Sequence, residues 1–317
     1  MKAKVTYILL LVFVLLSGCE QAFTPKGPYV QKLAVFGILS NNSDTQYVRV
    51  FKTYDPPGFN PYEVLEDQAV RGAEVEVGQG ASVVRYAEAM IPRTDSSRFS
   101  DNILAYVAPK FRARPGMTYN LDVSTPSDGI AHASVTVPDT GWIGLLNPYA
   151  LASNKSEDLL AVQLRISSLT LGYMVRFYLQ YDLLKVSTWV PMNMEMPGWM
   201  VIIDSTKYFG YPKLVRRSTT PGPRGTWQIE AAYFMPWAYR DKVAELVRFY
   251  GNTVRLRRIF FVLTQVEQNL YTFYNLANGY QDAISIRIDM PDWTNISGGI
   301  GLFGAMVEDT LFVEIPN

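Results

Sequence analysis

The sequence contains very little cysteine and histidine. Cys19 is the only cysteine and His132 the only histidine among 317 residues. A single cysteine excludes a disulfide within the chain. A Ser-His-Asp triad or a His-ligated zinc site would have to be built around His132 alone. Because His132 alternates with the apolar Ala131 and Ala133, we expect it on the solvent face of a strand, beside Ser134.

Long apolar runs and an excess of one charge are also missing. After residue 16, no stretch reaches the 18 or so uninterrupted apolar residues of a transmembrane helix. The 29 Lys and Arg balance 29 Asp and Glu, so no net field favours nucleic acid as a partner. Aromatic residues are plentiful, with 20 Tyr, 16 Phe and 6 Trp. This composition is typical of strands, so we expect a β-rich protein that is stabilised by burial.

The N-terminus carries a targeting pattern. Lys2 and Lys4 precede an apolar run over residues 5–16, and Ser17, Gly18 and Cys19 follow. A basic start, a short apolar run and small residues are typical of a secretory signal, and the run is too short to span a bilayer. The tetrapeptide Leu-Ser-Gly-Cys resembles the lipobox of bacterial lipoproteins, whose cysteine is acylated. We predict a lipoprotein signal peptide over 1–18, a lipidated Cys19 that binds the membrane, and a tether over 19–31.

Residues 32–138 show short alternating segments. The alternation is clearest at Tyr119, Leu121 and Val123, which face one way, and Pro115-Gly116 supplies a turn before them. We predict strands over 33–38, 47–53, 73–77, 103–107, 119–123 and 131–137. Regular short strands separated by such turns favour an immunoglobulin-like β-sandwich. The break at 138–141 predicts a domain boundary, with the first domain over 32–138.

Residues 139–317 predict a larger β-rich domain with two short helices, so the fold class is mostly β. We expect strands over 160–167, 173–181, 199–204, 226–234, 254–263, 283–288 and 309–315. An apolar stripe followed by Gly251 predicts a helix over 239–250. A second helix should begin with a capping box at Thr264 and Glu267, carry Val266 on its stripe, and end at Asn278.

A glycine-rich segment near the C-terminus spells GxGxxG at Gly299, Gly301 and Gly304. This dinucleotide fingerprint functions only between a strand and a helix, with an acidic residue about 20 positions further on. Too few residues follow Gly304 for either requirement. We therefore predict a glycine-rich bend between closing strands, and no cofactor.

Methionine and tryptophan gather in one stretch. Met192, Met194 and Met196 alternate, so in a strand their thioethers would share one face, and soft sulfur ligands select Cu(I). No His or Cys assists them, and methionine also fills irregular apolar gaps, so we predict no metal site. The stretch 189–199 is instead predicted to be an interaction loop for a partner or ligand, with the candidate residues Trp189, Met192, Met194, Met196 and Trp199.

Three segments carry a family resemblance. Residues 33–37 (LAVFG), residues 115–123 (PGMTYNLDV) and above all residues 295–305 (NISGGIGLFGA) resemble the domain of unknown function 4249 lipoproteins of Bacteroidota. The resemblance spans essentially the whole chain after the signal. It implies an envelope lipoprotein associated with a TonB-dependent outer-membrane transporter. It offers no catalytic residues.

We therefore predict a membrane-anchored envelope lipoprotein with a non-enzymatic binding or scaffolding role, accessory to such a transporter. The alternative is a lipoprotein that binds a glycan or another small ligand through aromatic residues of the C-terminal domain. A third hypothesis is a hydrolase with two carboxylates, although no spacing singles out a pair. Residues 20–23 lack the acidic run associated with surface export, so we predict the outer membrane, at its periplasmic face.

Overall fold

The computed structural model describes residues 27–56, 60, 64, 66–93, 102–152, 158–218, 227–278 and 293–314. The chain divides into a unit of residues 1–31 and a unit of residues 32–317, and the named strands and helices all belong to the second. Strands dominate this unit, so the predicted mostly-β class is confirmed. The predicted strand over 283–288 lies outside the described residues.

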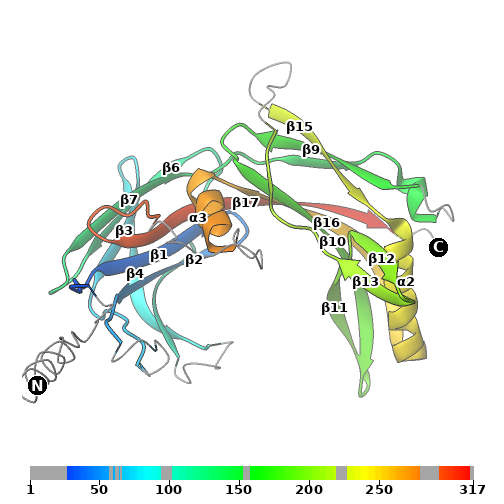
Figure 1. The fold of residues 1–317 in the computed structure, drawn as a ribbon, viewed down its shortest axis with the longest axis horizontal. Helices are drawn as coiled ribbons and strands as arrows, with labels where there is room; N and C mark the ends of the chain where they lie inside the picture. Colours follow the sequence, from blue (N-terminus) through cyan, green and yellow to red (C-terminus); the bar gives the residue numbers. More distant parts are fainter. Residues whose placement is uncertain are drawn as a thin grey trace, which may run out of the picture. The chain divides into compact units, whose positions relative to one another are not determined.

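The first half of the unit consists of β1 (Leu33–Ser40), β2 (Thr45–Lys52), β3 (Glu74–Gln79), β4 (Ser82–Ile91), β5 (Ile103–Pro109), β6 (Thr118–Ser124) and β7 (Ile130–Thr136) (Figure 1). β4 pairs with β3 over 82–86 and with β5 over 87–91, so the sheet folds over on itself. The enclosed first core contains Val35, Val48, Val75, Leu121, Val123 and Phe303.

The sequence predicted six of these seven strands and missed β4. The buried face of β4 changes along the strand: Val84 and Tyr86 pack in the first core, whereas beyond residue 86 the half-buried residues are Ala89 and Ile91, on the opposite face. A strand without a continuous buried face gives no clear alternation.

The second half contains β8 (Trp142–Leu145), β9 (Leu160–Ser167), β10 (Gly172–Lys185), β11 (Thr188–Met196), β12 (Trp199–Ile203), β13 (Thr206–Gly210), β14 (Val215–Arg216), β15 (Trp227–Phe234), β16 (Val254–Val266) and β17 (Ile300–Glu314). One sheet has the order β15-β9-β8, and it packs on the sheet that contains β11, β10, β16 and β17. Between them lies the second core, which includes Leu164, Phe177, Phe234 and Phe261.

β17 belongs to both halves. Residues 300–306 pair in parallel with β1, and residues 306–314 pair antiparallel with β16. The sheet therefore continues in the order β11-β10-β16-β17-β1-β2-β5-β4-β3-β6-β7, and Figure 1 shows β17 running through both halves. The predicted strand over 309–315 is the second part of this element.

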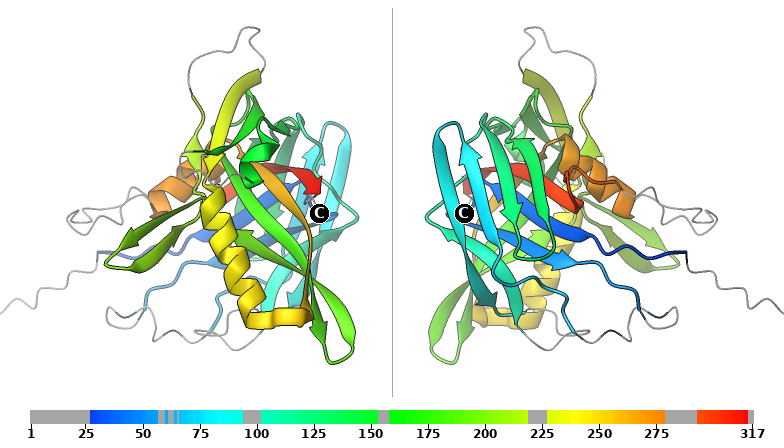
Figure 2. Two further views of the ribbon diagram at one scale, coloured as in Figure 1. Left: turned by 90° about the vertical axis from the view of Figure 1, so that its right-hand side faces the viewer. Right: turned by 90° about the vertical axis from the view of Figure 1, so that its left-hand side faces the viewer.

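Two α-helices accompany the strands in the described part of the chain. α2 (Pro236–Tyr250) begins three residues before the predicted helix and ends at Tyr250, before Gly251, as predicted (Figure 2). Tyr239 on its inner face stacks on Phe177, with ring centroids 5.3 Å apart. α3 (Gln268–Asn278) begins later than predicted. The predicted capping box is wrong, because Thr264 and Val266 continue β16.

The start of α3 is capped by a different residue. Glu267 accepts hydrogen bonds from the N–H groups of Asn269 and Leu270, at 2.5 and 2.8 Å. The predicted carboxylate therefore serves the helix start, but as the capping side chain itself rather than as the third residue of the helix.

Candidate functional site

The predicted loop over 189–199 is mostly strand β11, so the predicted conformation is wrong. β11 pairs with β10, which places Met196 opposite Phe177 and Met192 opposite Tyr181. The predicted sharing of one face by the methionines is confirmed: Met196 is fully buried, and Met192 and Met194 pack against the second core. Their thioethers fill this core, as methionine commonly does.

The two flanking tryptophans lie in different environments. Trp189 is half-buried, and the Arg255 guanidinium carbon lies 3.8 Å from its ring centroid, so a cation covers this indole. Trp199 opens β12 and is 46% exposed. Of the two, Trp199 is therefore the one that offers an open aromatic face.

Trp199 belongs to a two-stranded hairpin, β12–β13, that closes through Asp204 and Ser205. Both residues have positive φ, 47° and 63°, as the tight turns of two-residue hairpins require. The hairpin is anchored on one side: Met200 is buried, and the Lys207 ammonium lies 2.6 Å from Asp241 of α2. Met200 and Lys207 share this side because pairs across the strands alternate in face.

The opposite side of the hairpin is exposed and uncharged. Trp199, Val201 and Ile203 alternate along β12, and Tyr208 lies opposite Val201 on β13. All four are between 43% and 55% exposed. We call the surface formed by these four side chains the hairpin face. Exposed apolar surface of this kind is typical of binding sites.

The indole of Trp199 lies on Gly210, the residue opposite it in the hairpin. A Cβ atom at position 210 would overlap the ring, so only glycine permits this contact. Trp142 lies on Gly144 in a similar way and is equally exposed. The guanidinium carbon of Arg165, however, lies 5.4 Å from the centroid of the Trp142 ring. Trp142 is therefore a suitable control position for experiments that substitute Trp199, because it is an equally exposed tryptophan at another place.

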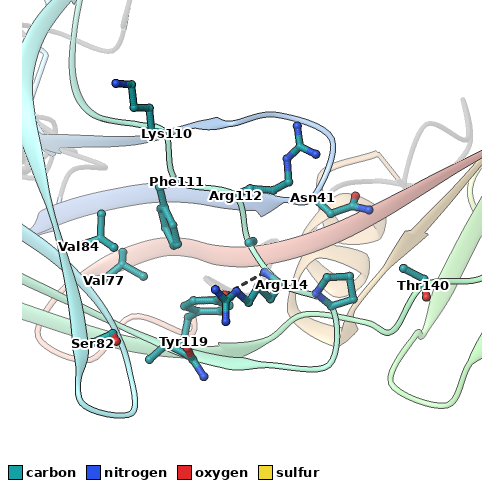
Figure 3. Close-up of a pocket in the computed structure, with 13 residues that line it drawn as sticks. Asn41, Val77, Ser82, Val84, Lys110, Phe111, Arg112, Arg114, Tyr119 and Thr140 are labelled. Atoms are coloured by element: carbon teal, nitrogen blue, oxygen red, sulfur yellow. Dashed lines mark hydrogen bonds between the residues drawn. The ribbon is translucent and has the colours of Figure 1, made fainter.

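A pocket of about 640 Å³ lies in the first half, beside the first core (Figure 3). The β3–β4 hairpin contributes Val77 and Val84, and the connection between β5 and β6 contributes residues 110–115. Three of these connecting residues are cations: Lys110, Arg112 and Arg114. The sequence analysis missed this pocket, because the hairpin and the connection come together only in the folded sheet.

His132 faces solvent, as predicted, with 57% of its side chain exposed. Its Nδ1 lies 2.5 Å from a carboxylate oxygen of Asp122 on β6. Its backbone exchanges two hydrogen bonds with Ser297, which joins β7 to the segment before β17. Within the described part of the chain, no group of three His, Cys, Asp or Glu is arranged to hold a metal ion.

The GxGxxG segment has a structural role. The bend predicted here is correct at Gly298 and Gly299, whereas Gly301 and Gly304 lie inside β17. A Cβ atom at Gly301 would overlap the carbonyl oxygen of Val35 on β1. Asn295 receives a hydrogen bond from the Phe303 N–H and donates one to its carbonyl, at 2.9 and 2.8 Å. The glycines of this segment thus allow close packing of the backbone and do not form a dinucleotide site.

Two carboxylates contact the main chain at β17: Glu267, which is buried beside it, and Asp309, which is half-buried within it. Burial raises the pKa of Glu267, although the backbone N–H groups that donate hydrogen bonds to its carboxylate oppose this shift. Burial likewise raises the pKa of Asp309, which accepts a hydrogen bond from the Gly141 N–H at 2.7 Å. Each of the two carboxylates thus accepts hydrogen bonds from main-chain N–H groups, which is a structural role.

The fold and these surfaces define a mostly β protein with two cores joined by one strand. The family model described as "Domain of unknown function (DUF4249)" matches residues 20–311, and the chain belongs to this family. No match to a curated protein is found. Among solved structures, the chain matches the C-terminal globular domain of an oligosaccharyltransferase from Pyrococcus abyssi, with 12% identity and a TM-score of 0.21. That match covers 74% of this chain and 48% of the other, and so weak a likeness carries no argument.

Cys19 lies outside the described residues. Within the described ranges, no helix is both long and apolar enough to cross a membrane.

Proposed function

We propose that the protein is a lipid-anchored envelope protein with a non-enzymatic binding or scaffolding role, and that the hairpin face binds its protein partner. The observation that carries this proposal is the exposed, uncharged surface of Trp199, Val201, Ile203 and Tyr208 on a hairpin whose other side is fixed to α2. Aromatic residues on a rigid support are typical of the centres of protein interfaces. The proposed partner is a TonB-dependent transporter of the outer membrane.

Crosslinking tests this partner. A photoreactive amino acid at Val201 should give, in native membranes, a covalent adduct with an outer-membrane transporter that mass spectrometry identifies. The same amino acid at Ile229, which is 58% exposed on β15, is the matched control. Absence of the transporter adduct at position 201, or an equal yield at both positions, would contradict the proposed interface.

The anchor is tested separately. Acylation of Cys19 should add the mass of a glyceryl lipid to the N-terminus of the mature protein, and Cys19→Ser should release the protein from the membrane fraction. A mature protein with an unmodified Cys19 thiol in its native host would contradict the lipid anchor.

A second candidate function is glycan binding at the same surface. It is favoured by the indole of Trp199, which lies on Gly210 and leaves its other side to solvent. Under this hypothesis Trp199→Ala abolishes binding on a glycan array, whereas Trp142→Ala does not. If neither substitution changes glycan binding, the aromatic face is not a sugar site.

A further inference from the structure

The pocket of Figure 3 differs in charge from the rest of the first half. Its lining includes Lys110, Arg112 and Arg114, and none of the described residues that line it is Asp or Glu. Elsewhere in this half, exposed arginines have carboxylate partners: Arg71 pairs with Glu88 at 2.9 Å, and Arg85 with Glu76 at 2.6 Å. The pocket is therefore where this half gathers positive charge.

The three cations lack protein acceptors. Within the described part of the chain, the side chains of Lys110, Arg112 and Arg114 make no hydrogen bond or ion pair. Figure 3 shows Lys110 and Arg112 pointing to the same side of the connection, away from Phe111, while Arg114 lies beside Tyr119. Their donors are thus available to an acidic ligand.

The connection that carries the cations is held firmly. The N–H of Arg114 donates to the Tyr119 hydroxyl at 2.9 Å, and the N–H of Phe111 donates to the Asp44 carbonyl at 2.8 Å. Ala113 is buried in the first core. Because the backbone is fixed at residues 111, 113 and 114, the charged side chains start from a defined position, which lowers the entropic cost of binding.

The remaining lining indicates an organic ligand with hydroxyl groups. The volume of about 640 Å³ falls within the range of small-molecule pockets, about 300–1,000 Å³, and exceeds what an inorganic ion needs. Ser82 and Thr140 contribute hydroxyl groups that make no hydrogen bond within the described residues. Phe111 and Val84 supply apolar surface against which a sugar ring can pack.

We propose that this pocket binds an acidic oligosaccharide, with Lys110, Arg112 and Arg114 pairing with its carboxylate or sulfate groups. This site is separate from the hairpin face and does not depend on the function proposed for it. Arg114 lies beside Tyr119, on the side where one sugar ring packs against Phe111, and Lys110 and Arg112 lie on the other side of the connection. The three cations therefore pair with acidic groups of successive sugar units, which is why the proposed ligand is an oligosaccharide rather than a single sugar.

Calorimetry on the full chain in detergent tests the proposal, with a galacturonic acid tetramer as the probe and its methyl ester as the neutral control. The acidic tetramer should bind, and the ester should not. The double substitution Arg112→Ala with Arg114→Ala should weaken binding by about tenfold or more, since charge-assisted hydrogen bonds are lost. The matched control, Lys185→Ala with Lys213→Ala, removes the same charge elsewhere and should leave the affinity unchanged.

Several outcomes would overturn the assignment. Equal binding of the ester would show that charge is not recognised, and equal losses in both double variants would show a diffuse field rather than a site. Tighter binding of a single-stranded oligonucleotide would assign another ligand class. Displacement of the tetramer by an equimolar amount of inorganic phosphate would make this a small-anion site.

Discussion

The two parts of β17 are held in the sheet in different ways. Residues 301–305 are buried and include Gly301 and Gly304, which let the backbone approach β1 and α3 closely. Residues 308–314 alternate between exposed and half-buried, and are held by side chains such as Phe312 against β16. The first part therefore needs glycines as well as the buried side chains of Phe303 and Ala305, whereas the second part contains no glycine and is held by side-chain contacts.

The largest effect is expected for Gly301→Ala. The residue has φ of 121°, and a Cβ atom would overlap the carbonyl oxygen of Val35. Strain and overlap together should lower the free energy of unfolding by about 3–5 kcal/mol in urea titrations. Gly129→Ala is the matched control, because its φ is 101° but no atom lies within 4 Å of its Cβ position; it should cost only about 1 kcal/mol. Equal losses would show that strain alone explains both.

Asn295→Ala should be the next most damaging change. The Asn295 amide satisfies both the N–H and the carbonyl of Phe303, a fully buried residue. Loss of these partners should lower the free energy of unfolding by about 2–3 kcal/mol. Asn120→Ala, at an exposed position of β6, should change it by less than about 0.5 kcal/mol. A loss at Asn295 no larger than this would mean that water replaces the amide.

Glu267→Gln tests the buried carboxylate beside the first part of β17. Both carboxylate oxygens of Glu267 accept hydrogen bonds, from the N–H groups of Asn269, Leu270 and Ala305. A glutamine side chain has only one acceptor oxygen, because its other terminal atom is an NH2 donor, so it cannot replace all of these hydrogen bonds. The free energy of unfolding should fall by about 1–3 kcal/mol.

The same substitution should flatten the pH dependence of stability. Because burial raises the pKa of Glu267 in the folded state, the folded protein binds this proton more tightly than the unfolded chain does. The resulting stability is present below the ordinary pKa of 4.5 and is lost as the pH rises through the raised pKa. Urea titrations across this range should show a smaller decline for the Gln variant, and an unchanged decline would contradict the role of Glu267.

The smallest effect is expected for Phe312→Ala in the second part of β17. Its ring is half exposed and lies 5.5 Å from the Phe260 ring, with the Arg258 guanidinium carbon at 4.0 Å. Loss of these surface contacts should cost about 1 kcal/mol or less in thermal or urea unfolding. A loss as large as that of Gly301→Ala would remove the distinction between the two parts.

The sequence predicted the strands whose two faces differ in burial. The strand at Tyr119, Leu121 and Val123 is an example, because its alternate residues are all buried. β4 was missed since its buried face changes part-way along the strand, and the start of α3 was misplaced since Thr264 and Glu267 imitate a capping box at the end of a strand. The pairing of β4 with β3 and β5, and of the end of β16 with β17, determines both structures. A single sequence does not reveal which distant strands pair.

The candidate site was predicted only in part. Trp199 lies on an exposed face as an interaction residue should, whereas Met196 is fully buried in the second core. Tryptophan and methionine suit both environments, so spacing alone does not separate them. Lys110, Arg112 and Arg114 were not singled out from the sequence. Only the pairing of β3 with β6 and β4 places them around one pocket.

The sharing of β17 has a consequence for synthesis and maturation. The first core includes Phe303, Ala305 and Val307, although most of its residues lie between Leu33 and Val137. Until the last strand emerges from the ribosome, β1 has an open edge and the first core lacks one wall. The sheet of either half is therefore complete only when β17 has paired with both β1 and β16, so we expect the two cores to be completed together.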